Sequence, residues 1–192
     1  MKQALTAGLP QLSRNLSDAQ LNTLCQFGDE LLSKNQVMNL TAITEPQQVA
    51  QLHFLDCIAL LGAANFYGKS VIDVGCGAGF PGVPLKVAEP SIQLTLLDSL
   101  KKRMDWLGQV LPQLEIEAQC VSARAEEYAL EHREQYDIAV SRAVARLTML
   151  AELCLPLVRV GGQFIAMKSA DSDEEISQAA HAISLLGGKA TR

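Results

Sequence analysis

A glycine-rich segment, VIDVGCGAGFPG at residues 71–82, is the part of the sequence best suited to binding a ligand. Gly75, Gly77 and Gly79 let the backbone turn sharply and approach a ligand where a Cβ would clash. Asp98 ends the next apolar run, nineteen residues after Gly79. A carboxylate at that place can accept hydrogen bonds from both hydroxyls of a ribose. The pattern therefore predicts a site for a nucleoside-bearing cofactor.

The identity of the cofactor depends on Asp73. Gly77, Gly79 and Gly82 satisfy GxGxxG, so an NAD-dependent oxidoreductase is one hypothesis. Asp73, two residues before Gly75, would lie awkwardly beside a pyrophosphate but well beside an ammonium group. S-adenosylmethionine carries an α-ammonium, a sulfonium and a ribose, and no phosphate. The residues therefore favour S-adenosylmethionine, and the lack of GxxxxGK[ST] excludes a P-loop.

The elements that must hold these residues alternate between strand and helix after residue 68. We expect strands at 70–74, 93–97, 115–121, 136–140 and 163–167, and helices at 82–88, 100–111, 124–130, 147–158 and 173–186. Such alternation predicts a Rossmann-like α/β fold with a mostly parallel, doubly wound sheet. Ligands bind such sheets beyond the carboxyl ends of the strands.

Residues 1–65 are expected to form a helical appendage to a domain that spans residues 66–192. Residues 1–16 form either a helix or an arm, and Ser17 caps a helix that carries leucines at helical spacing. A polar connection is expected at 33–39. Thr44 and Pro46 suit the start of a second helix that runs to about Leu61. Its expected apolar side comprises Val49, Leu52, Leu55 and Ile58 or Ala59.

Composition excludes several protein classes. The 192 residues hold 16 Lys and Arg against 21 Asp and Glu, a net charge of −5, which excludes a histone-like polycation. No apolar run approaches the roughly 18 residues of a membrane helix, and the N-terminus does not resemble a signal peptide. The five cysteines include no CxxC pair, so neither a metal site nor a disulfide framework is indicated. We expect a cytoplasmic monomer.

Seven short motifs carry a resemblance to one known family. They are residues 39–41 (NLT), 53–56 (HFLD), 79–85 (GFPGVPL), 97–103 (LDSLKKR), 125–127 (AEE), 141–143 (SRA) and 166–168 (AMK). Residues 73–79 resemble the first motif of class I S-adenosylmethionine-dependent methyltransferases. Together, over about residues 20–170, the motifs resemble the bacterial small-subunit ribosomal RNA methyltransferase G family, also called glucose-inhibited division protein B.

The resemblance implies a reaction, a partner and site residues. The reaction is 16S rRNA (guanine(527)-N7) methylation in the 530 loop, with the small ribosomal subunit or its precursor as partner. From the resemblance, the expected cofactor residues are Gly75, Phe80, Ala125, Glu126 and Arg142, to which the glycine-rich segment and the strand end add Asp73, Gly77, Gly79 and Asp98. Arg142 and Lys168 are expected to position the substrate. Cations expected to meet RNA are Lys101, Lys102, Arg103, Arg124, Arg146 and Lys168.

Three departures from the family pattern stand out. Cys57 and Ser169 occupy positions where the family usually has Ser and Gly. Family members usually continue into a closing β-hairpin, whereas this sequence stops at Arg192. A missing terminal strand leaves a sheet edge unpaired, so we expect an effect on stability rather than on the site.

The sequence suggests no general base. Guanine N7 carries a lone pair and no proton, so positioning alone can drive its methylation. His53 is expected to be structural, whereas Asn39 and Thr41 either cap a turn or contact RNA. A non-catalytic adenosine-binding or ribosome-assembly module is a further alternative.

Overall fold

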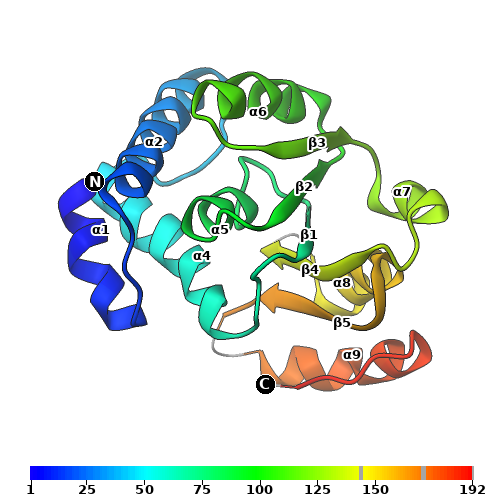
Figure 1. Cartoon of the computed structure of the whole chain (residues 1–192). Coiled ribbons are helices and arrows are strands. Elements are labelled where there is room, and N and C mark those ends of the chain that lie inside the picture. The colour runs from blue at the N-terminus through cyan, green and yellow to red at the C-terminus, as the bar shows by residue number, and fades with distance from the viewer. Residues whose placement is uncertain (143–144, 170–171, 192) are drawn as a thin grey trace.

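The chain folds around one parallel sheet. The computed structural model describes residues 1–142, 145–169 and 172–191, and in them five strands form a sheet of order β3-β2-β1-β4-β5 (Figure 1). The strands are β1 (Ser70–Val74), β2 (Gln93–Asp98), β3 (Ala118–Ser122), β4 (Tyr136–Arg142) and β5 (Val158–Met167). All four neighbouring pairs are parallel. The Rossmann-like prediction is confirmed.

Helices cover both faces of the sheet. α2 (Asp18–Met38), α5 (Gly82–Ala88) and α6 (Lys101–Gln113) lie on one side, and α7 (Ala125–Glu131) and α8 (Leu147–Cys154) on the other (Figure 1). Successive side chains of β1 point to opposite faces of the sheet, so this strand contributes to the core on each face. Val71 joins the cluster under α2, α5 and α6, whereas Ile72 and Val74 join the cluster under α7 and α8. α9 (Asp173–Leu185) packs on α8 through Ala179 and Ile183.

The N-terminal helices share the first of these cores. Residues 1–16 form α1 (Lys2–Gly8) and a 3-10 turn, η1 (Leu9–Leu12). Ser17 caps α2 in a capping box with Gln20, as expected for its N-cap position. Leu5, Leu24 and Phe27 pack in one cluster with sheet residues. The division at residue 65 stays a prediction, because this cluster is continuous across it.

Two expectations for this region are wrong. Residues 33–38 belong to α2 rather than to a connection, because a polar stretch is also the solvated face of a helix. The helix ends at Asn39, whose left-handed backbone (φ 50°) stops it. The next helix starts with Pro46, but its N-cap is Glu45 rather than Thr44, and no side chain caps it.

The second N-terminal helix is interrupted. α3 (Pro46–Val49), a π-helical segment η2 (Ala50–Leu55), α4 (Asp56–Ile58) and a 3-10 turn η3 (Ala59–Gly62) follow in sequence. The π segment changes the register of the buried side, so Phe54 is buried while Leu52 is 55% exposed. Leu52 was therefore wrongly placed on the apolar side, whereas Val49 and Ile58 were correctly placed there.

The largest later differences concern α8, β5 and β3, and β5 starts at Val158 rather than at residue 163. α8 ends at Cys154, because Pro156 follows within a 3-10 turn, η4 (Leu155–Leu157), and Val158 already starts β5. β3 starts at Ala118 rather than at residue 115, because α6 runs to Gln113 and Glu115 turns the chain with φ 56°. Within the described ranges, no helix is long and apolar enough to cross a membrane.

The strand order creates a switch point. The chain leaves β1 toward β2 and β3, then returns to place β4 on the other side of β1. The connections beyond the carboxyl ends of β1 and β4 therefore diverge and leave a crevice between them.

Candidate functional site

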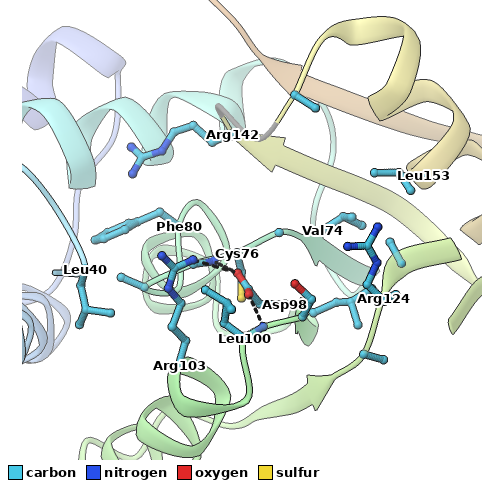
Figure 2. A pocket seen from close by; sticks show the side chains of 18 of the residues that line it. Leu40, Val74, Cys76, Phe80, Asp98, Leu100, Arg103, Arg124, Arg142 and Leu153 are labelled. Atoms are coloured by element: carbon cyan, nitrogen blue, oxygen red, sulfur yellow. Dashed lines mark hydrogen bonds and ion pairs between the residues drawn. The ribbon is translucent and has the colours of Figure 1, made fainter. Parts of the chain in front are cut away.

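A pocket of about 590 Å³ lies at this switch point (Figure 2). Segments that follow four strands line it: Gly75 to Ala78 after β1, Ser99 and Leu100 after β2, Ala123 to Glu126 after β3, and Arg142 at the end of β4. Leu40, Thr41 and His53 close it from the N-terminal region. Its volume is in the range of about 300–1,000 Å³ typical of small-molecule sites.

The glycine-rich turn after β1 is held against β2. Gly75, Gly77 and Gly79 all have positive φ values, of 71°, 58° and 93°, which explains the need for glycine. The Gly75 amide donates to the Leu97 carbonyl oxygen at 2.8 Å. Gly75 and Gly77 line the pocket, whereas Gly79 is buried beneath it. A Cβ on Gly79 would lie 2.7 Å from Val83 Cγ2, so Gly79 has a packing role.

Asp98 lies at the centre of the pocket wall. Its Oδ2 accepts a hydrogen bond from the Gly77 amide at 2.9 Å, and its Oδ1 accepts one from the Leu100 amide at 2.8 Å. Arg103 Nη1 approaches Oδ2 at 3.5 Å (Figure 2). Oδ1 accepts only the Leu100 bond among the described residues and has a second lone pair, so Asp98 can still accept a hydrogen bond from a ribose. The same contacts fix the side chain in advance of binding.

Asp73 lies behind the pocket rather than in its lining. Its Oδ2 accepts from the Gly82 amide at 2.7 Å. Its Oδ1 is buried and has no hydrogen-bond partner among the described residues. Burial raises the pKa of Asp73 to about 7, although the Gly82 amide and Arg142 oppose that shift. An unsatisfied buried carboxylate oxygen next to Val74 and Gly75 fits a cationic ligand group such as an ammonium.

One end of the pocket is apolar and rimmed by charge. Leu153 and Ala125 line it, and Met149, one helical turn before Leu153 on α8, also lines the pocket. Met149 is 56% exposed, so its side chain is free to contact a planar ring. Arg124 Nη2 and Glu126 Oε1 form an ion pair of 2.7 Å at this rim. Figure 2 shows Arg124 and Leu153 on the side of Asp98 away from Phe80.

The opposite end is polar and tightly connected. The Phe80 ring stacks on His53 with centroids 4.7 Å apart, and the Arg142 guanidinium lies 4.8 Å from the Phe80 centroid. Arg142 Nη2 lies 3.0 Å from His53 Nδ1, and His53 Nε2 lies 2.8 Å from Thr41 Oγ1. Burial and the Arg142 charge lower the pKa of His53 to about 4, so it is neutral at pH 7. Phe80 lies two residues before α5, which begins at Gly82.

The cations expected to bind RNA separate into groups. Arg103 and Arg124 line the pocket, and Lys101 and Lys102 are exposed on α6 beside it. Lys101 pairs with Asp105 at 2.7 Å. The other two lie toward β5 and α8. Arg146 is the exposed N-cap of α8, and Lys168 lines a neighbouring groove with Arg142 and pairs with Glu175 at 2.8 Å.

Several site residues escaped the sequence reasoning. Leu100, Met149 and Leu153 were not singled out, because a leucine or methionine on a helix usually belongs to the core. His53 was expected to be structural, yet it lines the pocket. Asn35 was missed because it lies inside α2, where its side chain fixes the backbone of Thr41. Ala143, the last residue of the 141–143 motif, lies outside the described residues.

Comparison with known proteins gives a consistent result. Residues 20–192 match the family model described as rRNA small subunit methyltransferase G. A ribosomal RNA small subunit methyltransferase G of Clostridium botulinum is 43% identical over 96% of this chain and 79% of its own length. The protein of the same name from Alkaliphilus metalliredigens is 48% identical over 98% of this chain and 80% of its own length.

Solved structures agree on the fold. A SAM-dependent methyltransferase from Aquifex aeolicus superposes with a TM-score of 0.55 at 15% identity, covering 84% of this chain and 90% of that one. A precorrin-6y C5,15-methyltransferase from Geobacter metallireducens also gives 0.55 at 12% identity, covering 79% and 75%. At such identities these similarities show a shared fold alone.

Proposed function

The chain belongs to the rRNA small subunit methyltransferase G family, and from this we propose that it is the 16S rRNA (guanine(527)-N7)-methyltransferase that uses S-adenosylmethionine. Family membership favours this hypothesis over the oxidoreductase and the non-catalytic module. We further propose that it acts in the cytoplasm as a monomer on the small ribosomal subunit or its precursor.

One observation carries the cofactor assignment. Two carboxylates at the carboxyl ends of adjacent strands are arranged for different partners: Asp98 in the pocket wall, and Asp73 behind it with one unsatisfied oxygen. Asp98 suits the ribose hydroxyls, and Asp73 suits the α-ammonium. The apolar end around Met149 and Leu153 suits the adenine, with Ala125 and Glu126 beside it. The Asp73 carboxylate lies beneath the glycine-rich turn after β1, where it would repel the pyrophosphate of NAD.

The chemistry asked of the protein is modest. S-adenosylmethionine supplies an electrophilic methyl group on a sulfonium. We propose that Asp98 and Gly75 hold the cofactor, and that Phe80 and Arg142, expected from the sequence to contact the cofactor, also line the end where a base can enter. Positioning of two reactants can contribute about 7–11 kcal/mol to a rate, and N7 needs no deprotonation. No residue therefore has to act as a general base.

We propose that RNA reaches the pocket across a basic rim. Lys101, Lys102 and Arg103 lie on one side of its mouth and Arg124 on another. Arg146 and Lys168 lie apart from this rim, and Lys168 lines the neighbouring groove at the end of β5. Phosphate contacts of this kind make binding weaken as salt rises. The separate location of Lys168 suits the RNA strand that flanks the target nucleotide.

Methyl transfer should need neither a thiolate nor a titrating base. Burial raises the pKa of all five cysteines, so they are thiols at neutral pH. We expect Cys57→Ser and Cys76→Ala to retain single-turnover methyl transfer, and the rate to be nearly flat from about pH 6.5 to 8.5 at saturating cofactor. Rapid-quench assays measure this. A tenfold rise per pH unit, or a protein–RNA adduct stable to denaturation, would refute the mechanism.

Two measurements test the proposal. Calorimetry with S-adenosylhomocysteine, S-adenosylmethionine and NAD should show binding of the first two. Labelled methyl transfer should then be compared on free 16S rRNA and on intact small subunits from cells lacking the methyltransferase. Binding of NAD in place of the sulfur nucleosides, or no methyl incorporation into either RNA, would overturn the proposal.

A further inference from the structure

Thr41 has an unusual hydrogen-bond arrangement at the polar end of the pocket. A guanidinium has only donors, so Arg142 must donate to His53 Nδ1, across their 3.0 Å separation. A ring nitrogen that accepts from Arg142 carries no proton, so this contact assigns the proton of the neutral His53 ring to Nε2. That proton is donated to Thr41 Oγ1 at 2.8 Å. The backbone amide of Ile43 donates to the same oxygen at 3.0 Å.

Both lone pairs of the Thr41 hydroxyl are thus occupied. The hydroxyl proton has no acceptor among the described residues, and Thr41 lines the pocket. The backbone of Thr41 is also fixed, because the Asn35 side chain bonds both its amide and its carbonyl at 2.9 Å. Thr41 therefore presents one donor, and no acceptor, to whatever enters this end.

The position of this donor points to the base rather than to the cofactor. The adenosine part of the cofactor is assigned to Asp98, Ala125 and the apolar end. Phe80 and Arg142 lie on the other side of Asp98, together with Leu40 (Figure 2). Thr41 follows Leu40 directly and touches His53, which stacks on Phe80. A base that enters this end would lie beside Thr41 and Arg142, which both line the pocket.

We propose that the Thr41 hydroxyl, fixed as a pure donor by His53 and Ile43, recognises O6 of the target guanine and rejects adenine. The proposal rests on the proposed function. Guanine presents N7 and O6, both acceptors, on one edge, whereas adenine presents N7 and a donating N6 amine there. A hydroxyl with no free lone pair can pair with O6 but leaves the N6 amine unsatisfied. His53 is then a positioning residue that sets the direction of the hydroxyl.

The test separates recognition of O6 from a structural role. Target RNA is prepared with guanine or with 2-aminopurine at the methylated position, since 2-aminopurine keeps N7 but lacks O6. Single-turnover rates are measured for the wild type, Thr41→Val and Thr41→Ser. We expect the wild type to favour guanine by about tenfold, the magnitude of one neutral hydrogen bond. Thr41→Val should lower this ratio to near one, and Thr41→Ser should restore it.

Other outcomes overturn the inference. If Thr41→Val slows both substrates equally, the residue only maintains the structure of the pocket. If Thr41→Val weakens binding of S-adenosylhomocysteine instead, the hydroxyl serves the cofactor carboxylate. If the wild type does not methylate the guanine substrate at all, the proposed function fails, and that result is distinct from a failure of the Thr41 assignment.

Discussion

Asp98→Ala is expected to reduce affinity for S-adenosylhomocysteine by at least about 100-fold. The ribose hydroxyls would lose a carboxylate acceptor, and hydrogen bonds to charged groups contribute about 1.5–3 kcal/mol each. The substitution would also free the Gly77 and Leu100 amides, which Asp98 now holds at 2.9 and 2.8 Å. The pocket wall would then lose both its ligand contact and its fixed shape. Titration calorimetry measures the affinity directly.

Asp105→Ala is the matched control. Asp105 lies on α6, close in sequence to Asp98, but is exposed and pairs with Lys101 at the surface. Exposed pairs of this kind contribute about 0–1 kcal/mol to stability, so we expect this variant to stay folded. Its affinity for S-adenosylhomocysteine should then equal that of the wild type. Unchanged affinity in Asp98→Ala, or equal losses in both variants, would show that Asp98 does not bind the ribose.

Affinity for S-adenosylhomocysteine is expected to rise with pH and to level off above about pH 7. Burial raises the pKa of Asp73 to about 7 in the free protein, so below that pH the group is protonated. The ligand ammonium favours the ionised form, so binding must release this proton. The affinity should therefore change by up to about tenfold per pH unit below pH 7, until the pKa of the complex is reached.

Asp73→Asn removes the titrating group while keeping its size. Its affinity should be independent of pH between about 5.5 and 8, and weaker than that of the wild type at pH 8. Stability supplies a second readout with a defined sign. A raised folded-state pKa stabilises the free wild type fully only below pH 4, and this contribution is lost as pH rises to about 7. If the affinity of Asp73→Asn for S-adenosylhomocysteine depended on pH as steeply as that of the wild type, Asp73 would not be the group that binds the ammonium.

The sheet and the glycine-rich turn were predictable because local rules dominate there. β1 and α5 have the predicted bounds, since an apolar run, a glycine-rich turn and a following helix each carry a strong local signal. The end of α8 was not predictable from its leucines, because Val158 continues the apolar pattern while Pro156 ends the helix. The π segment at Ala50–Leu55 left no pattern in the sequence, so the exposure of Leu52 was missed.

The site was predictable where chemistry is local and not where it depends on distant contacts. Asp98 and Gly75 follow from their place at strand ends. The role of His53 depends on Arg142, 89 positions away, and on Phe80, and no spacing rule links the three. Burial of Asp73 is likewise a property of packing, which is why its raised pKa could not be anticipated from the sequence.

Chemical mapping of the methylated nucleotide tests the proposed N7 methylation of 16S rRNA most directly. Small subunits or 16S rRNA from cells lacking the enzyme are incubated with the protein and S-adenosylmethionine, then treated with borohydride and aniline, which cleave RNA at N7-methylguanosine. We expect a strand break at guanosine 527 in the 530 loop with the wild type, and none with Asp98→Ala. Methyl incorporation without this break, or a break at another guanosine, would contradict the proposed function.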